Sequence, residues 1–262
     1  MSEPPGDGWD RLRWAGREGR RTLVHYRGLF VAIIADPLGF FDRAMAPNTP
    51  TVPLSPLAYL ATAFAIVALV APLQGLLSHA SGIVDALAQV LGLPPGFEPP
   101  REIPGVVLIN LSELTGVSAI DNVLRQGVQA AVYGGYAWVL WQLLGTGRVP
   151  RRAVLGCVGY SLGTLLVVSE LIAAVSYGWL IVAGGDDPKA LVDQYLLLGG
   201  LDAIAVLYFF FGLPARWLSH GYGLGFVKTA AVLAGGLVLF GVAVMVALQL
   251  IWAVTGVGIE FF

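Results

Sequence analysis

Two carboxylates, Glu170 and Asp202, lie inside long apolar stretches of the sequence. A charged side chain is costly in hydrocarbon, so such a residue usually faces neighbouring helices or water rather than lipid. Helical spacing puts Glu170 on the same face as the small residues that precede it, and Asp202 follows Gly199 by one turn. At a rise of about 1.5 Å per residue, both carboxylates fall in the outer half of a membrane-spanning bundle, where they could meet. Arg125 and Gln129 reach similar depths.

The polar cluster of Arg125, Gln129, Glu170 and Asp202 allows three interpretations. The first, which we favour, is a set of hydrogen bonds between polar side chains that holds the helices in register. The second is the handling of protons or cations, because Arg125 with both carboxylates carries one net negative charge that needs a proton or a bound cation. The third is a pocket for a lipid or small ligand, with aromatic walls formed by Tyr133, Tyr136 and Trp141.

Residues for other kinds of chemistry are scattered along the chain. His25, His79 and His220 fall in three separate parts of the sequence, so they do not indicate a histidine metal site. A lone cysteine, Cys157, lies in an apolar stretch where an inert, buried thiol is expected. A net charge of -2 and a pI near 5.9 argue against a nucleic-acid partner. We therefore predict no enzyme activity, no metal and no cofactor.

The composition requires elements that face lipid. Hydrophobic residues make up 56% of the 262 residues and charged residues only 12%, with a mean hydropathy of +0.75. Apolar runs long enough to cross a bilayer predict an all-α integral membrane protein with a five-helix membrane domain over residues 54–255. The five expected spans are about 57–77, 127–144, 153–175, 195–213 and 229–252.

The basic residues are sorted between the two sides that five spans define. Twelve of the 15 lysines and arginines fall in the N-terminal tail and in the second and fourth loops. Because cationic loops are retained in the cytoplasm, the N-terminus is expected inside and the C-terminus outside. A sixth span over 103–124 would spoil this asymmetry and would place Asn110, Glu113 and Asp121 in lipid, so we reject it.

Residues 1–53 are expected to form a cytoplasmic tail with a short helix at the membrane interface. Tryptophan and apolar side chains favour the headgroup boundary, and arginine is attracted to anionic lipid. The alternative is a docking surface for a cytosolic protein. The expected interface residues are Trp9, Trp14, Arg20, Arg21, Phe40 and Phe41. The outer loop 78–126 should carry a short surface helix of its own, because Ile83, Val84, Leu87, Val90 and Leu91 recur at helical spacing.

Glycines mark the expected contacts between helices. Gly156, Gly159 and Gly163 share a helical face with Glu170, and Gly159 and Gly163 form a small-xxx-small pair that lets two membrane helices approach closely. Gly199 should have the same function beside Asp202. The pattern leaves open whether the partner helix belongs to this chain or to another protein.

Three short segments carry a likeness to a known family. They are Asp36-Pro-Leu-Gly-Phe-Phe41, Gly147-Arg-Val-Pro-Arg-Arg152 and Gly156-Cys-Val-Gly-Tyr-Ser161. With an inner N-terminal tail and five spans, the chain resembles the Ypt-interacting-protein (Yip) family over roughly residues 30–255. The resemblance implies a bacterial-type member in the inner (plasma) membrane. The acidic tail motif of eukaryotic members is absent, so binding to small GTPases does not carry over.

These observations favour a non-catalytic scaffold or accessory subunit. Its partners would be the lipid bilayer and other membrane subunits or further copies of the chain, held at the small-residue faces. The alternative is a small transporter or permease that uses the intramembrane carboxylates Glu170 and Asp202 as its coupling site.

Overall fold

The computed structural model describes residues 8–44, 53–92, 134–136, 138–140, 142–144, 149–185 and 187–255. Regular structure in these ranges is helical, without a strand. Arg125, Gln129 and half of the expected span 127–144 lie outside the described residues. The helices are α1 (Gly8–Ala35), α2 (Pro37–Ala44), α3 (Pro56–Ala80), α4 (Ile83–Leu91), α6 (Arg151–Ala183), α7 (Pro188–Val206), η1 (Leu207–Gly212), α8 (Leu213–Tyr222) and α9 (Phe226–Thr255).

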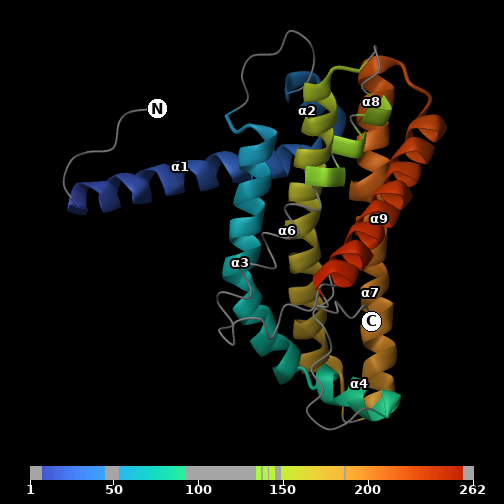
Figure 1. Ribbon diagram of the computed structural model, residues 1–262. Helices are drawn as coiled ribbons and strands as arrows, with labels where there is room; N and C mark the ends of the chain where they lie inside the picture. Colours follow the sequence, from blue (N-terminus) through green and yellow to red (C-terminus); the bar gives the residue numbers. More distant parts are fainter. Residues whose placement is uncertain are drawn as a thin grey trace.

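The long helices form an upright bundle (Figure 1). Helices α3, α6 and α7 run side by side, and α7 continues through η1 into α8, while α9 crosses the bundle obliquely. Helix α2 packs beside α8 at one end of the bundle, which we call the α2 end. Helix α4 lies across the opposite end, which we call the α4 end. Helix α1 runs across the bundle, and its first part projects beyond it.

Three described helices are long and apolar enough to cross a membrane: Arg151–Ala183, the continuous Pro188–Tyr222 and Phe226–Ala243. A fourth is α3, if its parts Pro56–Val70 and Pro72–Ala80, bent by 44°, count as one span. Pro72 has no N–H to donate within the helix, which explains the bend. The helical, membrane-compatible class predicted from composition is confirmed, and the helices at 153–175 and 195–213 are longer than expected.

The short helix expected in the loop after the first span is present as α4. It begins after Gly82 and ends before Gly92, both of which have a left-handed backbone (φ of 69° and 66°) that glycine adopts without strain. Ile83 and Ala86 are buried against the turn between α6 and α7. Val84 and Leu87 pack partly against the same cluster, whereas Val90 and Leu91 are exposed, so the first part of α4 closes the end of the bundle.

Burial changes along α6. From Ala153 to Leu166 almost every side chain is buried, because α3, η1 and α8 pack around this part of the helix. From residue 167 onward the helix becomes more exposed, and large apolar side chains such as Leu171, Val175 and Val182 lie on its surface. The two halves of the bundle thus present different surfaces.

Candidate functional site

Two of the predicted packing glycines lie where α6 meets α3. A Cβ atom on Gly159 would lie 2.9 Å from Cβ of Pro56, and one on Gly163 would lie 2.8 Å from the ring of Tyr59. Only a residue without a side chain permits such an approach. Gly156 is also buried. Gly199 differs from the expectation, because it is exposed and nothing lies within 4 Å of the position of its Cβ.

Buried tyrosines join α1 and α3 to α6 next to these glycines. The hydroxyl of Tyr26 on α1 donates to the carbonyl of Gly163 at 3.1 Å, and Tyr59 on α3 shares a hydrogen bond of 2.9 Å with Thr164. The rings of Tyr26 and Tyr59 stack with centroids 4.5 Å apart. Burial, reinforced by Tyr59, raises the pKa of the Tyr26 hydroxyl, so this group stays a neutral donor.

Phe40 and Phe41 were expected at the membrane interface, and the structure shows that this was wrong. Both are 2% exposed. Phe40 lies 5.1 Å from Tyr160 and 5.7 Å from Trp217, measured between ring centroids, and the indole N–H of Trp217 donates to the carbonyl of Pro37 at 2.7 Å. The break at Asp36-Pro37 turns α2 back onto α6 and α8, so its aromatic residues enter the core.

Asp36 holds the start of α2. Its Oδ1 accepts from the backbone N–H of Gly39 at 3.0 Å, and its Oδ2 pairs with Arg43 at 3.4 Å. A side chain on Gly39 would collide with the Asp36 carboxylate, which explains why glycine stands there. An exposed contact of 3.1 Å between His220 and Asp42 adds a second link from α2 to α8.

The π-helix η1 explains the serine of the Gly-Tyr-Ser segment. In η1 the N–H of Leu213 donates five residues back to Tyr208, so the next donor in this pattern would be residue 214 and its acceptor Phe209. Residue 214 is proline and has no N–H. The hydroxyl of Ser161 donates to the Phe209 carbonyl instead. The pair Ser161 and Pro214 therefore fixes how α6 meets the α7–α8 junction.

Glu170 and Asp202 lie at matching positions of α6 and α7. These antiparallel helices are aligned by the Tyr177–Tyr195 stack, with ring centroids 6.3 Å apart. Glu170 lies seven residues before Tyr177, and Asp202 lies seven residues after Tyr195. Seven residues are close to two helical turns, so the alignment puts Glu170 and Asp202 at a similar level of the two helices.

Both carboxylates are half-buried. The backbone carbonyl of Glu170 accepts from Nε2 of Gln74 on α3 at 2.7 Å. Oδ1 of Asp202 is buried and has no hydrogen-bond partner among the described residues. The placement of Arg125 and Gln129, the other two members of the predicted cluster, lies outside these residues.

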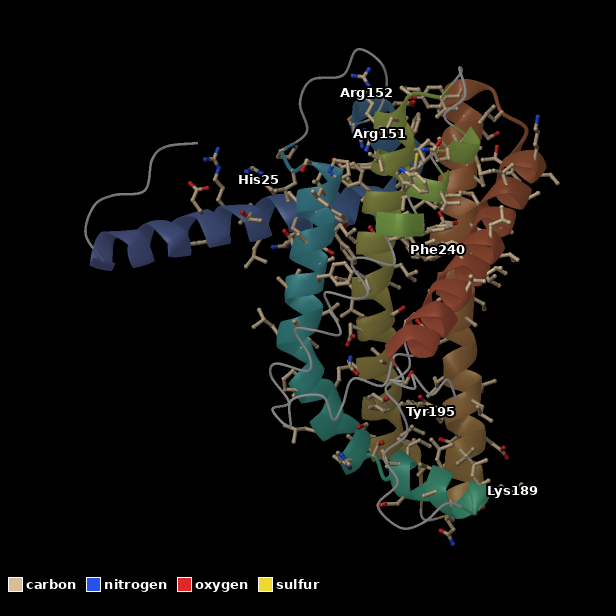
Figure 2. The ribbon with its side chains drawn as sticks, in the orientation of Figure 1. His25, Arg151, Arg152, Lys189, Tyr195 and Phe240 are labelled. Atoms are coloured by element: carbon tan, nitrogen blue, oxygen red, sulfur yellow. The ribbon has the colours of Figure 1, made fainter. Side chains whose placement is uncertain are left out.

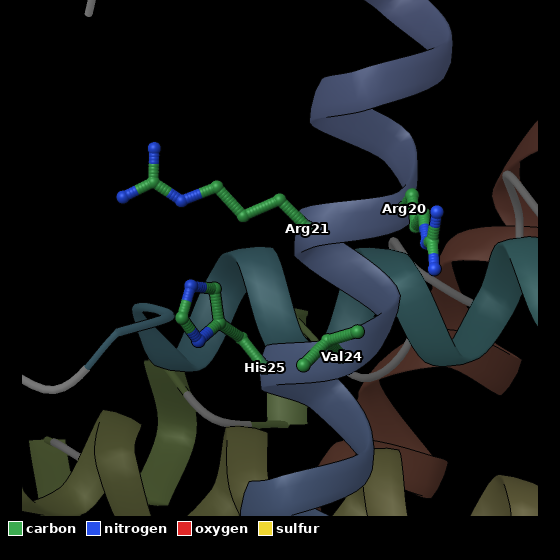
Figure 3. A pocket seen from close by; sticks show the side chains of 4 residues that line it. All are labelled: Arg20, Arg21, Val24 and His25. Carbon is green, nitrogen blue, oxygen red and sulfur yellow. The ribbon is translucent and has the colours of Figure 1, made fainter.

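The remaining predicted interface residues lie on α1. Arg20 and Arg21 are exposed; Arg21 and His25 extend to one side of the helix and Arg20 to the other (Figure 3). Trp9 and Trp14 belong to the helical backbone of α1, and their side chains lie outside what the structure describes. Among the described residues, the surface hollow at Arg20, Arg21, Val24 and His25 is open and shallow rather than an enclosed site.

Trp217, Tyr59 and Tyr26 were missed by reasoning from sequence. Aromatic residues near the ends of apolar runs are common at membrane interfaces, so their types alone did not mark them as a buried cluster. The sequence did contain one indication of an irregular helix near Trp217. It is Pro214, one residue past the expected span 195–213. Comparison of the chain with protein-family models, curated proteins and solved structures finds no match.

Proposed function

We propose that the chain is a five-span membrane protein that acts without catalysis as a scaffold or accessory subunit, with its N-terminus in the cytoplasm and its C-terminus outside. The observation that carries this proposal is the way in which α1 is attached to the bundle. Tyr26 holds the second part of the helix on α6, and the first part projects from the bundle (Figure 1). A helix that is held at one part and projects at the other provides a surface on which lipid or another protein can bind.

The apolar surface of the bundle supports a membrane setting. Leu171, Val175, Trp179 and Val182 on α6 are exposed, and Leu69, Leu73 and Leu76 on α3 are exposed as well. So much uncovered apolar area is typical of contact with lipid or with another membrane subunit. Lys189 lies at the α4 end, and Arg151 and Arg152 lie at the α2 end (Figure 2). The basic residues make the α2 end the cytoplasmic side in this proposal.

Membership of the Yip family, in a bacterial inner membrane, belongs to the same proposal. Its support is that two of the resembling segments meet in space. Phe40 of the Asp36–Phe41 segment contacts Tyr160 of the Gly156–Ser161 segment, next to Trp217. Contact between the two segments gives a physical reason for them to occur together.

The proposed role is tested by isolating the full chain in a mild detergent and measuring intact masses of the complexes. A scaffold or accessory subunit should be recovered with one membrane protein in a fixed ratio, or as an oligomer of itself. Recovery as a monomer that retains a small solute would contradict this role and favour the transporter.

The transporter remains the second candidate because of one observation. Asp202 has a buried oxygen without a hydrogen-bond partner among the described residues, and the helix alignment puts Glu170 at a similar level. Two carboxylates that come together in an apolar bundle can share a proton or hold a cation. Either use would suit a small permease coupled to protons or cations.

We expect Glu170→Gln and Asp202→Asn to change the yield of folded protein more than any transport signal, because in the proposed scaffold both polar side chains serve helix packing. A change of about 1 kcal/mol would alter the ratio of folded to unfolded protein about fivefold. The measurement is folded yield after purification, followed by a proton-flux assay in liposomes. If both variants fold normally and lose a proton-coupled current, the transporter is correct and the scaffold is not.

A further inference from the structure

Helix α1 has one face that the bundle covers. Tyr26, Leu29 and Ile33 are buried, and their spacing of three and four residues puts them on a single face. This face packs against α3 and α6, and other described side chains of α1, such as Leu23 and Val24, are exposed. The remaining surface is divided into an apolar part and a polar part.

The apolar part faces away from the bundle. Leu23, Val24, Val31 and Ile34 are 52%, 62%, 53% and 49% exposed. Helical geometry places Arg20 and Arg27 among them and places Arg21 and His25 on the other side. Figure 3 shows this separation for Arg20, Arg21 and His25, and Figure 2 shows His25 on the edge of α1 nearer to Arg151 and Arg152. The polar side of α1 therefore faces the α2 end.

The position along the bundle axis at which α1 contacts α6 separates two parts of the protein surface. Tyr26 contacts Gly163, and α6 runs 20 residues further to Ala183. This length spans about 30 Å, the thickness of a hydrocarbon core. The exposed apolar residues of α6, from Leu171 to Val182, all lie within it. The stretch from Pro188 on α7 to Tyr208 in η1 has the same length, and its exposed apolar residues begin at Leu196.

Near the α2 end, Leu57 at the start of α3 and Phe226 and Val227 at the start of α9 are exposed apolar residues. On α2 and α8, by contrast, the exposed side chains are mainly polar. They include Asp42, Arg43, Arg216 and His220, while Phe40, Phe41 and Trp217 between them are buried. A surface of this kind is typical of a protein part in water. If the membrane were instead centred on the spans predicted from the sequence, these charged side chains would lie at the lipid boundary. Helix α1 would then lie inside the hydrocarbon core.

We infer that the inner surface of the membrane crosses the protein at α1, and that α1 docks there on anionic lipid headgroups. Leu23, Val24, Val31 and Ile34 enter the edge of the acyl chains, and Arg20 and Arg27 bind headgroup phosphates. The α2 end, with α2 and α8, stands outside the bilayer as a cytoplasmic cap. This inference rests on the proposed cytoplasmic side and deepens the proposal by naming the lipid partner.

The test places a nitroxide label on the full chain at Val24→Cys, Val175→Cys or Arg216→Cys, one at a time. The native Cys157 is fully buried, and the unlabelled parent gives the background. The protein is reconstituted in vesicles of phosphatidylcholine, alone or mixed equally with phosphatidylglycerol. Label depth is read from the ratio of accessibility to oxygen and to a water-soluble nickel reagent.

We expect Arg216 labels in water, Val175 labels near the bilayer centre and Val24 labels at a shallow depth between them. Adding phosphatidylglycerol should raise the oxygen-to-nickel ratio at Val24 severalfold. The double substitution Arg20→Ala with Arg27→Ala should abolish this response, whereas Arg21→Ala with His25→Ala, on the opposite side of α1, should retain it.

Two results would overturn the inference. A Val24 label as accessible to nickel as Arg216 in both lipids would mean that α1 stays in water and serves a protein partner. A Val24 label as deep as Val175 would mean that the membrane covers the α2 end. Both are independent of whether a partner subunit copurifies, so failure here is distinct from failure of the scaffold role.

Discussion

Replacing Trp217 by alanine should lower the free energy of unfolding by about 3–5 kcal/mol, the range for truncating a large buried aromatic side chain. Trp217 is fully buried, packs against Phe40 and Phe41, and donates its indole N–H to Pro37. Its loss should release α2 from the bundle. Denaturation in mixed micelles measures the stability, and limited proteolysis near α2 detects the release.

Trp217→Phe is the matched control for this prediction. It keeps an aromatic ring between Phe40 and Phe41 and removes the hydrogen bond to Pro37, so a loss of about 1–2 kcal/mol is expected. Equal stability of Trp217→Ala and the parent protein would show that the aromatic cluster does not hold α2 in place.

Ser161→Ala should lower stability by about 1–2 kcal/mol, because the Phe209 carbonyl in η1 would lose the donor that replaces the missing N–H of residue 214. The removed hydroxyl is small, so the packing of α6 should otherwise be preserved. The same denaturation in mixed micelles measures the effect.

Pro214→Ala supplies the decisive comparison for Ser161. An alanine at position 214 has an N–H that can donate to Phe209 in the pattern that Leu213 already follows. In the Pro214→Ala protein, Ser161→Ala should lower the free energy of unfolding clearly less than it does in the parent protein. An equal cost in both backgrounds would contradict the account of Ser161 as the substitute donor.

The helical membrane class was predictable because composition and run length decide it. Apolar runs of about 20 residues leave few alternatives to spanning helices, and α3, α6, α7 and α9 arise where such runs lie. The ends of the helices were less predictable. Helix α6 continues to Ala183 and α7 begins at Pro188, beyond the expected spans 153–175 and 195–213. Hydropathy alone does not show at which residue a helix ends.

The contacts at the α2 end could not be predicted because they join distant segments. Phe40 and Phe41 have the residue types of an interface anchor, and only their partner Trp217, far along the chain, makes them core residues. Gly199 shows the reverse case. It has the spacing of a packing glycine, yet the face of α7 that it occupies is exposed. A pattern within one helix does not reveal which face another helix will cover.

The sidedness of the membrane-spanning helices is the central claim, and tags at the two ends of the chain in intact cells test it most directly. We predict that an N-terminal tag is protected from an impermeant reagent and that a C-terminal tag is labelled. Labelling or protection of both tags together would contradict an odd number of crossings and, with it, the cytoplasmic position of α1.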